Sequence, residues 1–459
     1  MRVNRRTFLG GGVAASLWAF ERAASAPTPA PADAPRRLEA APASLQIAAP
    51  PAAATRLLAY NGAAPGPLLR LRKGEEVRLR LANRLEEGTT LSFPGLRAAN
   101  AAAGIGGLTQ PLVAPGADLD IRFTPPDSGF NLYFPDAGGA TAKQIGGGLY
   151  GAIVVEETSP PATDLETIVV LADWRLDDEG QIKDDFSDAS VARGAGRLGA
   201  LLTANAAPAP LTLFPAPGAR VRLRLANAAT ARIMSIGVTG VRPLIVAVDG
   251  QPSEPFEPLH NAFPMGPSAR FELMFDMPRE AGAAVGFTLN GGEAAAIAGE
   301  PDRPMVVFEA RGEVVAARPE IAGLPANPLL PKEIRLERAM RVDLTIEGGG
   351  AAPFTVNGAS FSDWNVKPLF AVPRGAPVTL GFFNKTAVAQ AMRLGGHVGR
   401  LLHELDDGWE PYWRDTILVA PGRAAHLAFV ASNGGKWPLC SAIPERRAAG
   451  VGAWFQAVG

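Results

Sequence analysis

Side chains that could bind a transition metal are few in this sequence. They comprise one cysteine and four histidines: Cys440, His260, His397, His403 and His426. Copper in electron-transfer sites takes two imidazoles and one thiolate, yet the segment around the cysteine, PLCSAIPE, contains no histidine. We therefore expect Cys440 to pack as a small, buried hydrophobic residue. A lone thiol also excludes a disulfide within the chain.

Two acidic segments offer carboxylates to a hard cation such as Ca²⁺. They are HELDDGWE (403–410), which includes His403, and DDEGQIKDDFSD (177–188). The second segment lacks the ligand spacing of an EF-hand loop. We expect both segments to be solvated surface loops rather than metal sites.

The charge balance and the motif content exclude several classes of function. Lys plus Arg (44) nearly equals Asp plus Glu (45), and the sequence has no basic cluster of the kind that nucleic-acid binding needs. It also lacks a GxSxG elbow, a P-loop and an HExxH motif. The charged residues therefore fit a mixed, solvated surface, and we expect no nucleic-acid partner.

A repeated strand pattern organises most of the chain. In EEVRLRLANRL, apolar residues alternate with Arg78 and Arg80, and this period of two is typical of a strand with one buried face. The string VRLRLAN occurs at 77–83 and again at 221–227, and a looser copy, VTLGFFN, occurs at 378–384.

A second pattern recurs in the same order, as a Pro/Gly turn followed by an alternating strand. Two ordered families of motifs, about 150 residues apart, imply three homologous β domains. The copies of the second pattern are VAPGADLDIRF (113–123), PMGPSARFELMF (264–275) and VAPGRAAHLAF (419–429).

These repeats, with 51 glycines and 42 prolines to form tight turns, predict an all-β fold of sandwich domains. We place the three domains at 37–158, 165–312 and 338–459. Helix signals are few, and we expect helical turns only in LGALLTAN (198–205) and near Arg446.

The N-terminal residues predict export. Residues 1–26 start with a basic segment, continue with a short apolar run and end in small residues, which is the layout of a signal peptide. The core NRRTFLG fits the twin-arginine type. A Pro/Ala-rich linker follows at 27–36. No later segment is long and apolar enough for a membrane helix. We therefore expect a bacterial periplasmic protein without a transmembrane anchor.

The order of many short motifs resembles that of the multicopper oxidase family. The resemblance implies three cupredoxin-like Greek-key β-sandwich domains, and copper held by ten histidines and one cysteine in four motifs. The segments that carry it include YNGAAPGPLLRLRKGEEVRLRLANRL (60–85), QIGGGLYGAIVVEE (144–157), FTVNGASF (354–361) and YWRDTILVAPG (412–422).

All ten histidine positions that the resemblance implies carry other residues here. Only the cysteine is kept, as Cys440, while His397 matches a position that is not a ligand in the family. We therefore expect no catalytic residue, no cofactor and no metal site. The substituted positions are Ser92 and Pro94 (in SFPG), Phe134 and Asp136 (in YFPD), Gln390, Arg393 and Gly395 (in QAMRLGGH), and Leu439, Ser441 and Glu445 (in PLCSAIPE).

Two of the substituted residues carry opposite charges. The positions of Asp136 and Arg393 face the same interdomain copper cluster in the family. We hypothesise that these two residues form an ion pair in the vacated site, because buried charges are tolerated when they are paired and hydrogen-bonded. The alternative is two unrelated surface charges.

The resemblance leaves two main functions open, since a fold does not fix a function. The first is a non-catalytic periplasmic scaffold for a protein partner in the bacterial envelope. With this function the chain would resemble the copper-less SufI/FtsP-type proteins, which support the cell-division septal ring. The alternative is an oxidoreductase of the multicopper oxidase family with a remodelled copper site built from Cys440, Asp136, Glu445 and stray histidines. A cation carrier ranks last, because the 8 methionines are not clustered.

Overall fold

The computed structural model describes residues 35–292, 299–402 and 408–459. The predicted signal peptide (1–26) and nearly all of the predicted linker (27–36) lie outside the described residues. The first strand begins at Arg36. Within the described ranges, no helix is long and apolar enough to cross a membrane.

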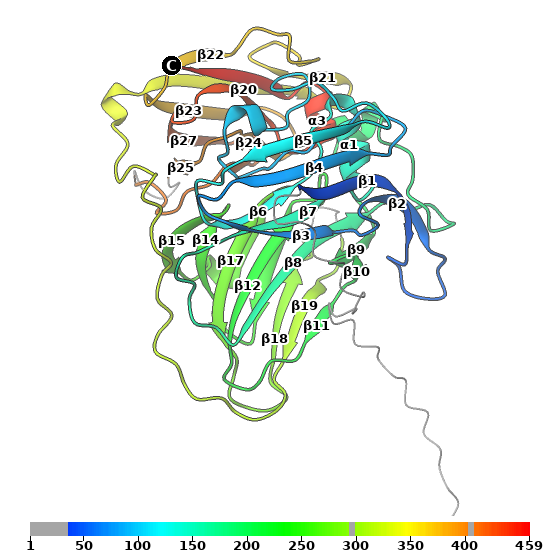
Figure 1. The fold of residues 1–459 in the computed structure, drawn as a ribbon, viewed down its shortest axis with the longest axis vertical. Coiled ribbons are helices and arrows are strands. Elements are labelled where there is room, and N and C mark those ends of the chain that lie inside the picture. Colours follow the sequence, from blue (N-terminus) through cyan, green and yellow to red (C-terminus); the bar gives the residue numbers. More distant parts are fainter. Residues whose placement is uncertain (1–34, 293–298, 403–407) are drawn as a thin grey trace, which may run out of the picture. The chain divides into compact units, whose positions relative to one another are not determined.

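The chain folds into three pairs of β-sheets that follow one another along the sequence (Figure 1), which confirms the all-β prediction. The first sheet pair joins a 4-stranded sheet, β2-β1-β4-β5, to a 3-stranded sheet, β3-β7-β6. One short helix, α1 (Thr141–Gly146), lies between β6 and β7. The strands are β1 (Arg36–Leu45), β2 (Thr55–Tyr60), β3 (Gly66–Arg72), β4 (Val77–Asn83), β5 (Asp118–Phe123), β6 (Gly129–Tyr133) and β7 (Gly151–Glu156).

The second sheet pair has a 7-stranded sheet, β10-β9-β8-β12-β17-β14-β15, and a 5-stranded sheet, β11-β19-β18-β13-β16. Helix α2 (Ala189–Arg193) precedes β9. The strands are β8 (Leu165–Trp174), β9 (Leu201–Ala204), β10 (Ala207–Pro208), β11 (Leu211–Leu213), β12 (Arg220–Asn227), β13 (Met234–Thr239), β14 (Leu244–Val248), β15 (Gln251–Phe256), β16 (Ala262–Met265), β17 (Arg270–Asp276), β18 (Ala284–Leu289) and β19 (Arg303–Glu309).

The third sheet pair has two 5-stranded sheets, β21-β20-β23-β27-β25 and β22-β29-β28-β24-β26. Helix α3 (Pro444–Ala448) follows β28. The strands are β20 (Met340–Gly349), β21 (Ala352–Val356), β22 (Phe370–Pro373), β23 (Pro377–Asn384), β24 (Gln390–Leu394), β25 (Gly399–Leu401), β26 (Thr416–Val419), β27 (Ala424–Val430), β28 (Gly435–Ser441) and β29 (Gly452–Val458). Each sheet takes its strands from one predicted domain, although the exact domain bounds stay a prediction.

The two recurring sequence patterns are hydrogen-bonded partners in every sheet pair. The strand of the first pattern (β4, β12 or β23) pairs antiparallel with the strand of the second (β5, β17 or β27). Its other edge pairs parallel with β1, β8 or β20. The register is also shared, because a valine faces a phenylalanine each time: Val77 and Phe123, Val221 and Phe275, Val378 and Phe429.

A buried asparagine ends the central strand of each repeat. Its side-chain oxygen accepts a hydrogen bond from the main-chain N–H two residues later, which closes a local turn. Its amide donates to a carbonyl at the start of the second pattern, so one side chain fixes two loops. These long-range bonds join Asn83 to Val113 (2.8 Å), Asn227 to Met265 (3.0 Å) and Asn384 to Val419 (3.0 Å).

The same heptapeptide, VRLRLAN, occupies two different environments. In β4 its arginines lie toward solvent, and the side chain of Arg80 is 43% exposed. In β12 every residue is buried, and the side chains of Arg222 and Arg224 are each 1% exposed. Neighbouring carboxylates therefore cover the outer face of β12, which the local alternation could not predict.

One prediction of secondary structure is wrong. The segment 198–205 contains strand β9 instead of a helical turn, because Leu201–Ala204 pairs antiparallel with β8 and Thr203 and Ala204 also pair with β10. These pairings override the helix propensity of its Leu and Ala residues. The helical turn expected near Arg446 is present as α3.

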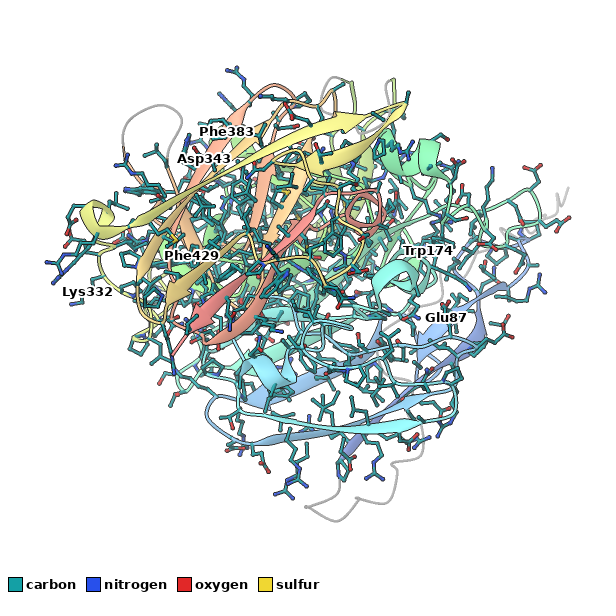
Figure 2. The ribbon with its side chains drawn as sticks, turned by 90° about the horizontal axis from the view of Figure 1, so that it is seen from above. Glu87, Trp174, Lys332, Asp343, Phe383 and Phe429 are labelled. Carbon is teal, nitrogen blue, oxygen red and sulfur yellow. The ribbon has the colours of Figure 1, made fainter. Side chains whose placement is uncertain are left out.

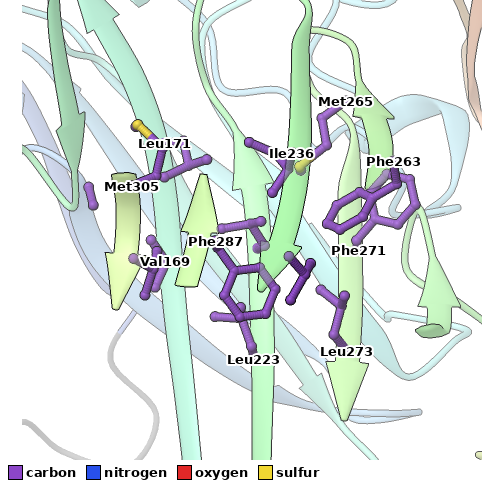
Figure 3. Close-up of a cluster of buried hydrophobic side chains, with 14 of the residues drawn as sticks. Val169, Leu171, Leu223, Ile236, Phe263, Met265, Phe271, Leu273, Phe287 and Met305 are labelled. Atoms are coloured by element: carbon purple, nitrogen blue, oxygen red, sulfur yellow. The ribbon is translucent and has the colours of Figure 1, made fainter. Parts of the chain in front are cut away.

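Apolar side chains from facing sheets fill the interior of each sheet pair. In the second pair, Leu223, Phe287 and Phe271 belong to one buried cluster (Figure 3). Phe429 lies among the strands of the third pair with no exposed surface, whereas Lys332 projects from the surface of the connecting segment (Figure 2).

Candidate functional site

The two substituted motifs of the first sheet pair lie side by side. Ser92 and Phe134 form an isolated antiparallel bridge, and the Ser92 hydroxyl donates to the Phe134 carbonyl at 2.8 Å. Asp136 follows two residues later, and its main-chain N–H donates to Thr90 Oγ1 at 2.8 Å. The backbone thus directs the first and second motifs to one place, as the resemblance implied.

The third and fourth motifs also meet, on neighbouring strands of the third sheet pair. Strands β24 and β28 are antiparallel, and Arg393 lies opposite Cys440. Leu439 and Ser441 flank the cysteine on β28 and face the residues on either side of Arg393. The four substituted motifs therefore form two pairs of neighbouring segments, one in each of these sheet pairs.

Asp136 and Arg393 form the predicted ion pair. Arg393 Nη2 donates to Asp136 Oδ2 at 2.9 Å, across the boundary between the first and third sheet pairs. Asp136 has no exposed surface and Arg393 is 6% exposed. The predicted ion pair is confirmed, and the alternative of two surface charges is wrong because both side chains are buried.

A second arginine, Arg447 of α3, completes the cluster. Its Nη1 lies 2.8 Å from Asp136 Oδ1 and 2.9 Å from Oδ2, and its Nη2 donates to Thr141 Oγ1 at 3.0 Å. Sequence reasoning missed Arg447. No local signal in the sequence points to it, because its role depends on how α3 packs against the strand that precedes it.

The charge of Asp136 is maintained by its two partners. Burial by itself would raise the pKa of this carboxyl, but the Arg447 and Arg393 guanidinium groups outweigh burial and hold the pKa below its usual value. Two cations thus surround one anion, and this cluster of three side chains carries a net positive charge.

Cys440 is fully buried, in agreement with the sequence-based expectation. It belongs to an apolar cluster with Ile105, Phe361, Trp364 and Trp454. A thiol enclosed in this way acts as part of the packing between the sheet pairs.

The remaining polar substitutions hold loops. Glu445 Oε1 accepts from the main-chain N–H of Arg197 at 2.9 Å, and burial raises the pKa of Glu445. Gln390 Nε2 donates to Thr386 Oγ1 at 3.1 Å. Next to Glu445, Arg446 donates to the carbonyls of Ala389 and Gly194. These bonds tie the third sheet pair to loops, while Glu445 Oε2 and Gln390 Oε1 are buried without a hydrogen-bond partner.

The space left among the substituted positions is small. Ser92, Pro94, Arg393 and Gly395 line one cavity of about 30 Å³. A single water needs a cavity of roughly 10–15 Å³, so this cavity suits one or two waters.

Within the described residues, no group of three or more His, Cys, Asp or Glu side chains could hold a metal ion. Hydroxyl, guanidinium and hydrocarbon groups do not suit copper, and the residues present therefore do not fit a copper cluster.

The described histidines contribute no side chain to the ion pairs of Asp136 with Arg393 and Arg447. His260 and His426 are exposed, and His403 lies outside the described residues, as does most of the acidic segment 403–410. His397 is buried among aromatic rings, and burial lowers its pKa to about 4. Its Nδ1 lies 3.0 Å from the Gly395 carbonyl, and its Nε2 accepts from the Asn433 N–H at 3.2 Å. This histidine is a packed structural residue.

The acidic segment 177–188 is mostly exposed, as expected. One of its carboxylates has a structural role, because Asp185 pairs with Arg175 at 2.7 Å and with Arg197 at 2.9 Å.

Comparison with known proteins agrees with this architecture. Two multicopper oxidase family models match residues 44–160 and 333–458, slightly more than half of the chain. The chain belongs to the multicopper oxidase family. Among its relatives, the multicopper oxidase MmcO of Mycobacterium tuberculosis is 28% identical and aligns over 95% of this chain and 93% of its own length.

Two further relatives bear on function and fold. The cell division protein FtsP of Edwardsiella tarda is 29% identical over 59% of this chain and 55% of its own length. The crystal structure of a multi-copper oxidase from Pseudomonas thermotolerans superposes with a TM-score of 0.81 at 28% identity, covering 93% of this chain and 99% of that chain.

Proposed function

We propose that this chain is an exported, non-catalytic binding protein built on the multicopper oxidase fold. The observation that carries the proposal is the buried cluster of Arg393, Asp136 and Arg447. These three side chains meet where the family resemblance locates the interdomain copper cluster.

The electrostatics of this cluster oppose copper binding. A copper cation placed beside Asp136 would compete with two guanidinium groups already within 3 Å of its oxygens. Displacing them would leave buried, unpaired arginines, and an uncompensated buried charge costs about 3–5 kcal/mol. Since no imidazole lies in the cluster, a metal would gain little from ligation to offset that cost.

The proposed setting is the bacterial envelope, with a protein as partner. The N-terminal sequence supports export to the periplasm by the twin-arginine route. Similarity to FtsP supports a contribution to cell division. A partner that recognises sheet faces or loops would need no metal from this chain.

A second candidate is an oxidoreductase with a remodelled copper site. It is favoured by the similarity to MmcO, which extends over nearly the whole of both chains. Its ligands would have to come from Cys440, Asp136 and Glu445. Each of these residues is buried and already has a packing, ion-pair or hydrogen-bond partner.

Copper loading distinguishes the two candidates. The purified chain is incubated with excess Cu(II), passed through a desalting column and analysed for bound metal and visible absorption. We expect less than one copper per chain and no intense blue band from a thiolate–copper bond. Stoichiometric copper with that band would reject the non-catalytic proposal and support the oxidoreductase.

A further inference from the structure

A second cavity shares no wall residue with the cavity beside Arg393. Its volume is about 170 Å³, and its walls come from the first and second sheet pairs, the segment that joins them, and the segment after the second pair. Polar wall residues include Lys73, Ser128, Glu157, Glu272 and Asn327. The volume suits a small organic group better than a single water.

Two carboxylate side chains line this cavity. Glu157 and Glu272 both line it, and both are bridged by Arg222, whose Nη2 lies 2.5 Å from Glu157 Oε1 and 2.5 Å from Glu272 Oε2. The neighbouring Arg224 is 3.5 Å from Glu157 and 3.6 Å from Glu272. The two arginines are buried behind the carboxylates and are not part of the cavity wall.

One carboxylate oxygen of this cluster lacks a hydrogen-bond partner, and so do Nε and Nη1 of Arg224. Glu272 is 1% exposed, and its Oε1 has no hydrogen-bond partner, whereas both of its bonds from Arg222 go to Oε2. A buried charged acceptor is strongly unfavourable when it is left unsatisfied. Glu157 adds a second negative group, because its contacts with Arg222 and Arg224 outweigh burial and lower its pKa.

We propose that this cavity binds an organic ammonium group. Such a group is a pure hydrogen-bond donor with a positive charge. It would satisfy Glu272 Oε1 and face Glu157, while the apolar walls from Pro252, Leu324 and Pro325 would contact its alkyl part. The ammonium could belong to a free amine or to a lysine side chain of a partner. This inference does not depend on the loss of copper.

The Lys73 ammonium group can compete with an added ammonium ion for this cavity. It lines the cavity and is itself exposed, so its flexible side chain can bring an ammonium toward the carboxylates. Removing it by Lys73→Met leaves both carboxylates and both arginines in place. That change should therefore strengthen binding of an added ammonium ion.

Calorimetric titration of the full chain with n-butylammonium chloride tests the proposal. Tetramethylammonium chloride is the matched probe, since it has the same charge but no N–H donor. We expect saturable butylammonium binding, about 10-fold or more tighter than tetramethylammonium binding. Glu272→Gln should weaken butylammonium binding by a similar factor, and Lys73→Met should tighten it.

Two further variants keep the test decisive if Glu272→Gln does not fold. Ser159→Trp enlarges an exposed wall residue without touching the Arg–Glu cluster, and it should abolish binding by filling the cavity. Asp120→Asn removes a carboxylate from the exposed pair with Arg80 and should leave binding unchanged. No saturable binding, equal binding of both probes, or unaltered binding in Ser159→Trp would overturn the proposal.

A lysine-bearing partner is distinguished from a free amine by competition. Nα-acetyl-lysine amide carries the same ammonium on a peptide-like group. If it binds at least as tightly as n-butylammonium and both compete, a protein side chain is the supported source. If only n-butylammonium binds, a free amine is supported.

Discussion

Arg447 Nη1 lies 2.8 Å from Asp136 Oδ1, although the two residues are 311 positions apart in the sequence. With Arg393 on the other side, the contact joins the first and third sheet pairs at the place where the family resemblance expects copper. The two sheet pairs are thus joined by buried ion pairs, and the stability of the chain should depend on them.

Removing the anion should strongly destabilise the chain. Asp136→Asn leaves two buried guanidinium groups without a counter-charge, and we expect a loss of about 3–5 kcal/mol in the free energy of unfolding. Chemical denaturation measures this loss. Asp120→Asn is the control, because its exposed pair with Arg80 should contribute only about 0–1 kcal/mol. Equal effects of the two variants would contradict a structural role for the buried cluster.

Replacing the whole cluster by apolar residues should have a much smaller effect. The triple variant Arg393→Met, Asp136→Leu, Arg447→Met removes all three charges of the cluster, and such replacements are often neutral or stabilising by about 1–4 kcal/mol. Denaturation of the triple variant beside Asp136→Asn tests this expectation. A triple variant less stable than the single one would mean that the cluster stabilises by more than charge compensation.

The two copies of VRLRLAN provide a matched pair of mutations. Arg222→Met leaves Glu157 and Glu272 without their shortest cation contact, and we expect a loss of about 3–5 kcal/mol. Arg78→Met changes the same position of the same heptapeptide in β4, where the arginine is exposed, and should change stability by less than about 1 kcal/mol. Similar losses at both positions would show that burial does not decide the effect.

His397 predicts an acid-dependent loss of stability. Its pKa is lowered to about 4 in the folded chain by burial, with a smaller contribution from Arg97, whereas the unfolded value is 6.5. Between these values the unfolded chain binds a proton that the folded chain does not, so stability falls as pH decreases from 6.5 to 4. The loss is on the order of 3 kcal/mol.

His397→Gln is the variant that isolates this contribution, because glutamine can still accept a hydrogen bond from the Asn433 N–H. The difference in unfolding free energy between the parent chain and the variant should change across pH 4–6.5 and be constant above it. This comparison cancels the contributions of other titrating groups to the pH dependence of stability. One of them is Asp415, whose pKa burial raises to about 6, so that its contribution has the opposite sign. A pH-independent difference would show that His397 does not titrate as described.

The sequence predicted the repeats well because strand periodicity and Pro/Gly turns are local signals. It also placed Asp136 and Arg393 together, since the family resemblance supplied their spatial relation. It could not predict Arg447, whose role depends on how α3 returns over Cys440. Nor could it distinguish Arg78 from Arg222, because identical strings differ only in what the rest of the chain packs against them. Strand β9 was missed for the same reason, since its partners decide its conformation.

The most direct measurement is a crystal of the chain soaked in Cu(II), with diffraction data collected at the copper absorption edge. We expect no anomalous peak among Asp136, Arg393, Cys440 and Arg447. We also expect electron density for a guanidinium group on both sides of the Asp136 carboxylate. An ordered copper peak bonded to Asp136 or Cys440, with the arginines displaced, would contradict both expectations.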